Sequence, residues 1–166
     1  VLVAGEASGD VLGARLIAAL RQRHPGDLKF SGVGGAQMAG QGLESLFPIA
    51  DLSVMGLAEI LPRVPLLLRR LRETALHVKA ARPSAVITID APGFCFRLAK
   101  RLAGEGIPLI HYVAPQVWAW RPDRARHLAG RIDHLLALLP FEPDFFREYD
   151  LPCEFVGHPV IEGVRE

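Results

Sequence analysis

The first candidate for chemistry is Asp90, which directly follows the short apolar run at residues 85–89 and precedes Pro92 by two positions. A carboxyl group with a reference pKa of about 3.9 is ionised at neutral pH. An exposed Asp90 could therefore accept a hydrogen bond from a substrate hydroxyl and take its proton as a general base. The alternative is that Asp90 only caps the turn before Pro92. We take Asp90 as the candidate catalytic residue.

The second candidate is the segment GEASGD at residues 5–10, which places two glycines and two carboxylates around a hydroxyl just before a helical pattern. Backbone amides at such a helix start could hold a phosphate or a sugar hydroxyl. Alternatively, the serine is a helix N-cap, the aspartate complements the helix dipole and the glycines only form a turn. The spacing is neither G-x-G-x-x-G nor a Walker A loop. The candidate binding residues are Gly5, Glu6, Ser8, Gly9 and Asp10.

The third candidate is the segment APQVWAWRP at residues 114–122, which contains both tryptophans of the chain. Aromatic faces and an arginine suit a sugar ring and an anionic group, through stacking and charge-assisted hydrogen bonds. We interpret Gln116, Trp118 and Arg121 as candidate binding residues. At least one tryptophan could instead close the end of the sheet as part of the core.

The sequence contains no motif typical of a metal site, a serine hydrolase or a nucleic-acid-binding protein. The six histidines show no metal-ligand spacing and Ser8 is not in a G-x-S-x-G elbow, so we assign no metal and no serine hydrolase site. Nineteen basic against eighteen acidic residues give a net charge of +1, which disfavours nucleic-acid binding. Cys95 and Cys153 are isolated, which favours a reducing cytoplasm, and we expect both to be buried. We find no stretch long enough to span a membrane.

The elements that must position these candidates alternate between short apolar runs and longer amphipathic stretches. That alternation predicts an α/β fold with a Rossmann-like open parallel sheet flanked by helices. In such a sheet the loops after the strands meet at one edge, where ligands bind. We predict strands at residues 1–4, 28–33, 85–89, 108–113, 132–138 and 154–156. We predict helices at residues 10–24, 94–103, 122–129 and 142–149.

The longest helical pattern runs from Leu57 to Val78 with apolar residues at spacings of three and four. Because proline is tolerated only in the first turn of a helix, we expect one helix to end before Pro62 and another to run from residue 64 to 81. The leucines and arginines at 63–72 could press this helix onto an anionic membrane, or form an ordinary packed helix with a solvated basic face. The predicted inward residues are Leu57, Ile60, Leu61, Val64, Leu67, Leu68, Leu71, Ala75 and Val78 there, and Val11, Leu12, Leu16, Ile17 and Leu20 in the first helix.

The length of 166 residues fits one domain, and 50% apolar residues with a mean hydropathy of +0.23 exclude a disordered chain. Because the chain opens without methionine inside an apolar run, we interpret residues 1–166 as a fragment that forms a single domain.

Taken together, the motifs resemble the lipid-A-disaccharide synthase family of inverting GT-B glycosyltransferases, and they follow the family's order along the whole chain. The matching segments are VAGEASGD at 3–10, GVGG at 32–35, VMGLAE at 54–59, IDAP at 89–92, HYV with VWAWR at 111–121, LPFE at 139–142 and FVGHP at 155–159.

The resemblance implies the N-terminal, acceptor-side domain of a GT-B enzyme, with the nucleotide-binding C-terminal domain absent. The implied reaction transfers 2,3-diacylglucosamine from UDP to 2,3-diacylglucosamine 1-phosphate, without a metal or organic cofactor, on the cytoplasmic face of the inner membrane of a Gram-negative bacterium. Asp90 matches the catalytic aspartate, and the binding residues above, together with Met55, match motif positions. Relatives often read Asp-Ala-Pro-Asp-Phe, whereas Gly93 stands at the second acidic position here.

Two alternatives stay open at this point. One is another GT-B or UDP-N-acetylglucosamine epimerase-like half, which would accept a soluble sugar as readily as an acylated one. The other is a flavodoxin-like module that holds a nucleotide without catalysis, and the absence of a phosphate-binding fingerprint disfavours it.

Overall fold

The computed structural model describes residues 1–53, 57–120 and 124–158, without the side chains of 57–60 and 120. The described residues contain a seven-stranded sheet in the order β3-β2-β1-β4-β5-β6-β7. Every pair of neighbouring strands is parallel, which confirms the open parallel α/β sheet expected from the sequence. The strands are β1 (Leu2–Ala4), β2 (Ser31–Val33), β3 (Glu44–Ser45), β4 (Val86–Ile89), β5 (Leu109–Tyr112), β6 (His134–Ala137) and β7 (Cys153–Phe155).

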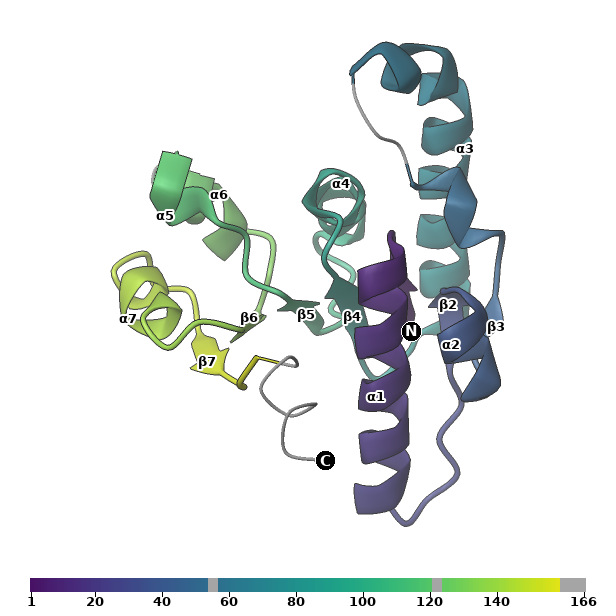
Figure 1. Ribbon diagram of the computed structural model, residues 1–166, viewed down its shortest axis with the longest axis horizontal. Helices are drawn as coiled ribbons and strands as arrows, with labels where there is room; N and C mark the ends of the chain where they lie inside the picture. Colours follow the sequence, from purple (N-terminus) through teal and green to yellow (C-terminus); the bar gives the residue numbers. More distant parts are fainter. Residues whose placement is uncertain (54–56, 121–123, 159–166) are drawn as a thin grey trace.

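Helices cover both faces of this sheet (Figure 1). Helices α1 and α2 pack on the face that buries Leu2, Ala4 and Ile89, whereas α3, α4, α6 and α7 pack on the face that buries Val3 and Val86. Neighbouring residues of a strand thus enter different cores, as the pleat requires. The helices are α1 (Ala7–Arg23), α2 (Ala36–Gly40), α3 (Leu57–Ala81), α4 (Pro92–Leu102), α5 (Val117–Trp120), α6 (Arg124–Ala129) and α7 (Glu142–Arg147), with a 3₁₀ turn η1 (Ile49–Asp51).

Some predicted boundaries and elements are wrong. Helix α1 begins at Ala7, three residues earlier than predicted, so the first turn contains Ser8, Gly9 and Asp10. The sequence analysis missed α2, β3 and α5, which have five, two and four residues. Such short elements show too few periods of any hydrophobic pattern to be recognised, and the surrounding contacts decide their structure.

The predicted break in the long helix is also wrong, because α3 is continuous over 25 residues and contains both Pro62 and Pro65. Both prolines lie on the exposed side of the helix, where water can satisfy the carbonyl groups that lose an N–H partner. Figure 1 shows that the amino end of α3 extends beyond the sheet. Among the described elements, no strand lies beneath this end of the helix.

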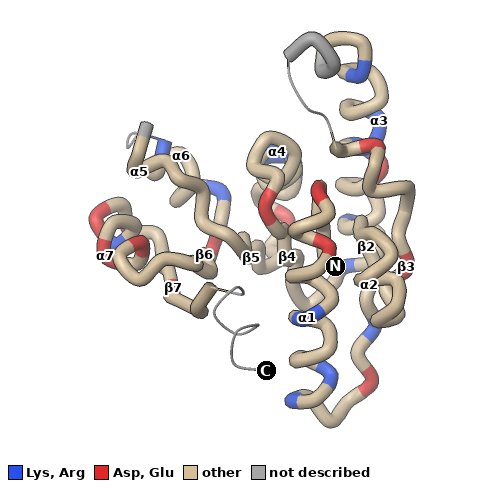
Figure 2. The backbone as a smooth tube through the Cα atoms, viewed as in Figure 1, with Lys and Arg blue, Asp and Glu red and all other residues tan. Residues whose placement is uncertain are grey.

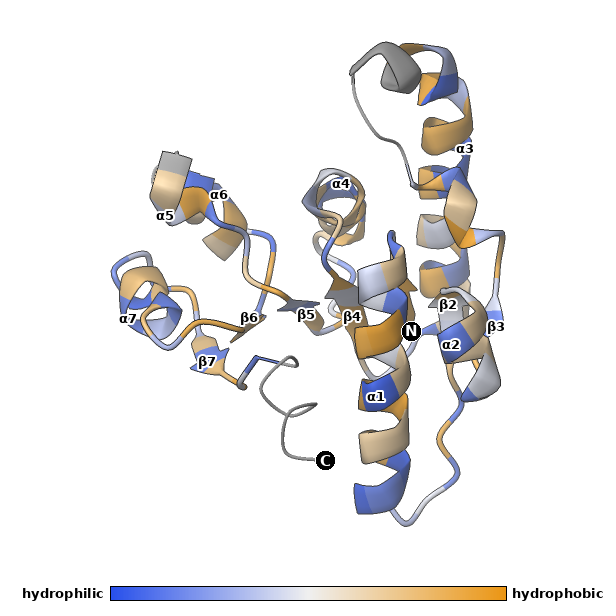
Figure 3. Ribbon diagram, in the orientation of Figure 1, coloured by the Kyte–Doolittle hydropathy of each residue, from blue (hydrophilic) through white to orange (hydrophobic). Residues whose placement is uncertain are grey.

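The predicted inward face is correct only where a helix lies over the sheet. In α3, Leu71, Ala75 and Val78 are buried, whereas Leu61, Val64, Leu67 and Leu68 are not, and the side chains of Leu57 and Ile60 lie outside the described part of the chain. The exposed fractions are 77% for Leu61, 37% for Val64, 49% for Leu68 and, in α1, 43% for Val11. Figure 3 shows hydrophobic residues continuing along α3 into the part that extends beyond the sheet. The spacing of apolar residues therefore predicted that a helix forms, but it did not predict which of these residues are buried.

The two cysteines differ in burial. Cys95 is fully buried as predicted, whereas Cys153 at the edge strand β7 is only partly buried, which corrects the expectation for that residue. Both thiols are free. Among the described helices, none is both long and apolar enough to cross a membrane.

Candidate functional site

The loop after β1 and the loop after β4 are in direct contact at the carboxyl edge of the sheet. A Cβ atom added at Gly5 would lie 2.4 Å from Cβ of Ala91, so the first loop approaches the second as closely as a glycine allows. A Cβ atom at Gly9 would lie 3.3 Å from both Cβ of Ala4 and the carbonyl oxygen of Ile89. The structure therefore brings the segment at residues 5–10 beside Asp90, and both glycines are packing requirements there.

Asp90 lies in a strained turn between β4 and α4. Its φ of 52° and the φ of 44° at Ala91 are left-handed values that non-glycine residues rarely adopt. Val113, at the end of the neighbouring strand β5, has a φ of 75°. The N–H of Asp90 donates to the carbonyl of Tyr112 over 3.0 Å, which ties the two loops together. Backbone strain of this kind is concentrated at functional sites.

The Asp90 side chain is half-buried and keeps its carboxylate unengaged by protein groups. Within the described part of the chain, no hydrogen bond or ion pair involves this carboxylate. Its charge lies close to the thiol of Cys95, whose pKa is raised to about 12, mainly by burial and secondly by the charge of Asp90. An acceptor with unused lone pairs at the sheet edge could receive a proton from a bound hydroxyl.

Beneath this turn lies a buried neutral pair formed by Thr88 and His111. Thr88 Oγ1 and His111 Nδ1 are hydrogen-bonded at 2.8 Å, and the His111 ring packs against Phe96 at 4.8 Å between centroids. Burial lowers the pKa of His111 to about 4, partly offset by a hydrogen bond with the backbone of Val113. The Nε2 atom of His111 has no partner of good geometry among the described residues. His111 is therefore uncharged at neutral pH.

Some side chains of the segment at residues 5–10 are exposed at the sheet edge, and one is buried away from it. Glu6 and Ser8 are exposed at the sheet edge, and Glu6, not Ser8, is the N-cap residue of α1. Asp10 is buried and accepts three backbone hydrogen bonds from Gly35, Gln37 and Met38 over 2.8–3.0 Å. These donors are at the amino end of α2, so Asp10 caps α2 across space. Its carboxylate is thus fully engaged away from the edge that carries Asp90.

The loop with the tryptophans is held by Glu142, which the sequence analysis did not single out. Trp118 Nε1 donates to Glu142 Oε1 over 3.2 Å, and the N–H of Leu139 donates to Glu142 Oε2 over 3.0 Å. The Trp118 ring also packs edge-on against Phe141 at 4.9 Å. Glu142 is 2% exposed. The available signal was a carboxylate among apolar residues at the start of a predicted helix, since burying one requires partners.

Two grooves flank the β4–α4 turn, and Pro92 lines both. The α3–α4 groove has a volume of about 350 Å³ and a mostly apolar lining, with Glu6 and Arg97 as its charged residues. The α4–α6 groove has a volume of about 620 Å³, and Gln116 lies in its wall. Asp90 itself lines neither groove but precedes their shared residue by two positions. The apolar lining of the α3–α4 groove consists of Leu52, Val64, Leu67, Leu68, Leu71, Ala91, Pro92, Gly93 and Phe94.

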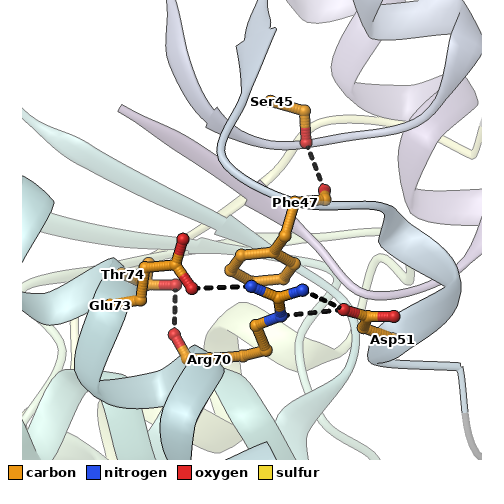
Figure 4. Close-up of polar contacts among 6 residues, drawn as sticks. All are labelled: Ser45, Phe47, Asp51, Arg70, Glu73 and Thr74. Carbon is orange, nitrogen blue, oxygen red and sulfur yellow. Dashed lines mark hydrogen bonds and ion pairs between the residues drawn. The ribbon is translucent and has the colours of Figure 1, made fainter. Parts of the chain in front are cut away.

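One wall of the α3–α4 groove is held in place by Arg70 (Figure 4). Its Nε and Nη2 both lie 2.7 Å from Asp51 Oδ2, its Nη1 lies 2.8 Å from Glu73 Oε2, and its guanidinium stacks on the Phe47 ring at 4.6 Å. The next residue after Asp51 is Leu52 in the groove wall. Ser53 Oγ then donates to the carbonyl of Gly5 over 3.2 Å. This segment therefore connects α3 to the loop beside Asp90.

Two predicted site residues, Met55 and Arg121, lie outside the described residues. In the described ranges no group of three His, Cys, Asp or Glu side chains could hold a metal ion. Gln116 is exposed and Trp118 is half-buried against the neighbouring loop. The structure thus brings Gly5, Glu6, Ser8 and Gly9 near Asp90, places Gln116 and Trp118 at the adjacent β5 loop, and directs Asp10 elsewhere.

The family model and the relatives that match this chain carry the same description. The family model described as lipid-A-disaccharide synthetase matches residues 1–166. A lipid-A-disaccharide synthase of Rhodospirillum centenum is 63% identical over 164 residues, covering 98% of this chain and 41% of the relative. Proteins of the same name from Granulibacter bethesdensis and Gluconobacter oxydans are 54% and 52% identical, covering 98% and 99% of this chain and 41% and 40% of each relative. The chain thus spans about two fifths of the length of these relatives.

Proposed function

The chain belongs to the lipid-A-disaccharide synthetase family, and from that premise we propose that it forms the acceptor-side domain of an inverting glycosyltransferase of the GT-B type. The remaining length of the relatives would supply the domain that binds the UDP-sugar. In this proposal residues 1–166 are one domain and carry the acceptor half of the site, so that transfer requires the complete protein.

The proposed reaction joins two acylated sugars. The 6-hydroxyl of 2,3-diacylglucosamine 1-phosphate attacks C1 of UDP-2,3-diacylglucosamine from the face opposite UDP. The new bond joins the acceptor oxygen to C1, the bond from C1 to the UDP oxygen breaks, and its electron pair leaves with UDP. The hydroxyl proton moves to the base, and the product is a β-1,6-linked disaccharide 1-phosphate. A base opposite the leaving group is the arrangement that inverting glycosidases use for water.

The single observation that carries the proposal is the Asp90 turn. Its carboxylate has no engaged partner in the described residues, lies at the carboxyl edge of the sheet and is held by left-handed backbone at positions 90 and 91. A base needs an accessible lone pair in fixed geometry, and a strained turn supported by the Gly5 contact supplies it. Gly93, the position where relatives often carry a second acid, lacks a carboxylate, which leaves Asp90 as the acid of this turn.

The other predicted site residues would contact the acceptor around this base. Glu6 and Ser8 lie exposed on one side of the Asp90 turn, and Gln116 and Trp118 belong to the loop on the other side. The carboxylate and hydroxyl of the first pair could bind sugar hydroxyls, and the indole ring could stack on a sugar ring. We retain Met55 and Arg121 as proposed contacts because they occupy matching motif positions.

The α3–α4 groove would receive an acyl chain of the acceptor. Its lining is dominated by Leu67, Leu68, Val64 and Phe94, and apolar chains require apolar surface to leave water. Leu61 and Leu68 are exposed on α3, and Arg63, Arg69 and Arg72 of the same helix are exposed as well. This combination favours peripheral binding to the anionic surface of the inner membrane on its cytoplasmic side.

The test of the proposed reaction uses the complete protein that contains this chain. Purified protein is given both acylated sugars, and UDP release and disaccharide phosphate are measured for the natural sequence, Asp90→Asn and the control Asp27→Asn, whose side chain is exposed. We expect Asp90→Asn to lower kcat by roughly 10²–10⁴-fold, the usual effect of a lost general base, with acceptor affinity nearly unchanged. Near-normal turnover in Asp90→Asn would remove this residue from the mechanism.

Membrane binding has a separate test. Vesicles that contain anionic lipid are sedimented without detergent in the presence of the complete protein, and we expect retention that decreases when Leu61 and Leu68 are both replaced by serine. Leu76→Ser is the control, because this residue is 56% exposed but lies on the later part of the same helix. Absence of retention with the natural sequence would contradict the membrane assignment.

A further inference from the structure

One wall of the α4–α6 groove is basic. Arg124, His127 and Arg131 line it, and their spacings of three and four residues place them on one side of α6 and the turn that follows. Figure 2 shows Lys and Arg residues gathered on α6. The groove has a volume of about 620 Å³, which can hold a polar headgroup.

The two arginines of this wall have no acidic partner within the described part of the chain. Arg70, Arg82 and Arg147 all form ion pairs, whereas no such contact involves Arg124 or Arg131. Among the residues that the structure describes, the groove lining also contains no Asp or Glu side chain. Positive charge without a protein counter-ion in a concave surface favours an anionic ligand.

The opposite wall places this positive charge beside the proposed base. It contains Phe96 of α4, Gln116 and Val117 of the β5 loop, and Pro92, which also lines the apolar α3–α4 groove. The Asp90 turn therefore has a mostly apolar groove on each side, and the α4–α6 groove adds Arg124, His127 and Arg131 to its apolar lining. A ligand with an apolar part, a central hydroxyl-bearing part and an anionic part would fit this arrangement.

We propose that the α4–α6 groove binds the phosphomonoester of the acceptor through Arg124 and Arg131. A phosphomonoester carries nearly two negative charges and three acceptor oxygens, which match the planar donor set of a guanidinium. The inference rests on the proposed function and adds to it the part of the site that distinguishes a sugar phosphate from the neutral sugar. Neither residue touches the reacting atoms, so both are specificity-determining residues.

The experiment compares two acceptors in the complete protein: 2,3-diacylglucosamine 1-phosphate and the same molecule without its phosphate. For the natural sequence we expect kcat/KM to be about 10- to 100-fold lower without the phosphate, the usual effect of losing one or two charge-assisted hydrogen bonds. In the double variant Arg124→Gln and Arg131→Gln this difference should disappear, while KM for the UDP-sugar stays unchanged. Arg131→Lys should retain part of the difference in kcat/KM between the two acceptors, because lysine keeps the positive charge but lacks the planar set of donors of a guanidinium.

The matched control is Arg126→Gln, which removes the same charge from the same helix at an exposed position outside the groove lining. Equilibrium binding of the phosphorylated acceptor should weaken about 10-fold or more in the double variant and remain unchanged in the control.

Three results would overturn the inference. If the double variant still prefers the phosphorylated acceptor, the phosphate binds elsewhere, although the transfer reaction itself stands. If KM for the UDP-sugar rises instead, the groove holds the diphosphate of the donor. If the natural protein transfers sugar to neither acceptor, both the proposed function and this inference are wrong. In the first two results the natural protein still transfers sugar, so the two kinds of failure can be told apart.

Discussion

Gly5 is the residue at which the candidate site has the least space. An added methyl group would overlap with Ala91, so we expect Gly5→Ala to lower the stability of the chain by about 1–3 kcal/mol, the usual cost of overpacking. The same overlap would displace the Asp90 turn, and kcat of the complete protein should fall as well. The measurement is thermal unfolding followed by circular dichroism, paired with the transfer assay.

Gly40 offers the control for this prediction. It is the last residue of α2, and nothing lies within 4 Å of an added Cβ atom. Gly40→Ala should leave activity unchanged and stability unchanged or slightly higher, because alanine restricts the unfolded chain more than glycine does. If both variants behaved alike, the close approach of the two loops would not control the site.

The buried His111 predicts a pH dependence of stability. Its pKa is about 4 in the folded chain, lowered mainly by burial, against 6.5 for a histidine side chain in water. Between these pH values the unfolded chain binds a proton that the folded chain does not. Folded stability should therefore fall as pH drops from about 6.5 to about 4, by up to about 3 kcal/mol, and should not depend on His111 above this window.

Urea unfolding at pH 5 and at pH 7.5 measures this effect. We expect His111→Leu to reduce the loss of stability between the two pH values, whereas His24→Gln, a change at an exposed histidine, should leave that loss as it is. An unchanged pH dependence in His111→Leu would mean that other groups cause it.

The direction in which a candidate side chain points could not be predicted from its local sequence. Asp10 lies in the first turn of α1 and Asp90 directly after β4, but the local sequence does not say which of the two carboxylates is engaged by backbone donors. The difference comes from residues 35–38, which place three backbone donors around Asp10 and none around Asp90. Contacts between distant segments, such as Gly5 with Ala91 and Trp118 with Glu142, have no local signal either.

At the scale of elements, α3 depends on Arg70 to hold the segment that carries η1. Replacing Arg70 with Met removes the ion pairs with Asp51 and Glu73 and leaves two carboxylates without their partner. We expect a lower free energy of unfolding, because the Asp51 carboxylate is partly shielded from water and loses its only ion-pair partner among the described residues. KM for the acylated acceptor should rise, because Leu52 in the groove wall follows Asp51.

Arg72→Met serves as the control, because Arg72 is exposed on the same helix and belongs to no ion pair in the described residues. Equal effects of the two variants on stability and KM would show that the loss of helix charge, and not the contact with Asp51, is responsible.

The same element shows what periodicity can and cannot predict. The spacing of Leu71, Ala75 and Val78 correctly predicted a helix face buried on the sheet. The same spacing continued to Leu61, where no sheet lies beneath, and there the inward prediction was wrong. Strands β4 and β5 were found because apolar residues dominate each of them, whereas the two-residue β3 gave no pattern.

At the scale of the whole molecule, residues 1–166 should bind the acceptor without the donor. The proposed acceptor groups all lie on this chain, whereas the relatives are more than twice its length. We expect isothermal calorimetry of the folded chain to detect 2,3-diacylglucosamine 1-phosphate but not UDP. Circular dichroism confirms folding in the same sample, and tight UDP binding without lipid binding would contradict the assignment as the acceptor side.

The strand order also determines when the central strands can pair during synthesis of the chain. The central strand β1 needs β4 as a neighbour, and β4 begins only at residue 86. At a synthesis rate of about 5–20 residues per second, β1 would emerge roughly 4–17 s before its partner exists. During that time an apolar strand edge is open to other chains. One edge of β1 therefore stays open until β4 has been synthesised, and we expect chaperone binding to the nascent chain during that interval.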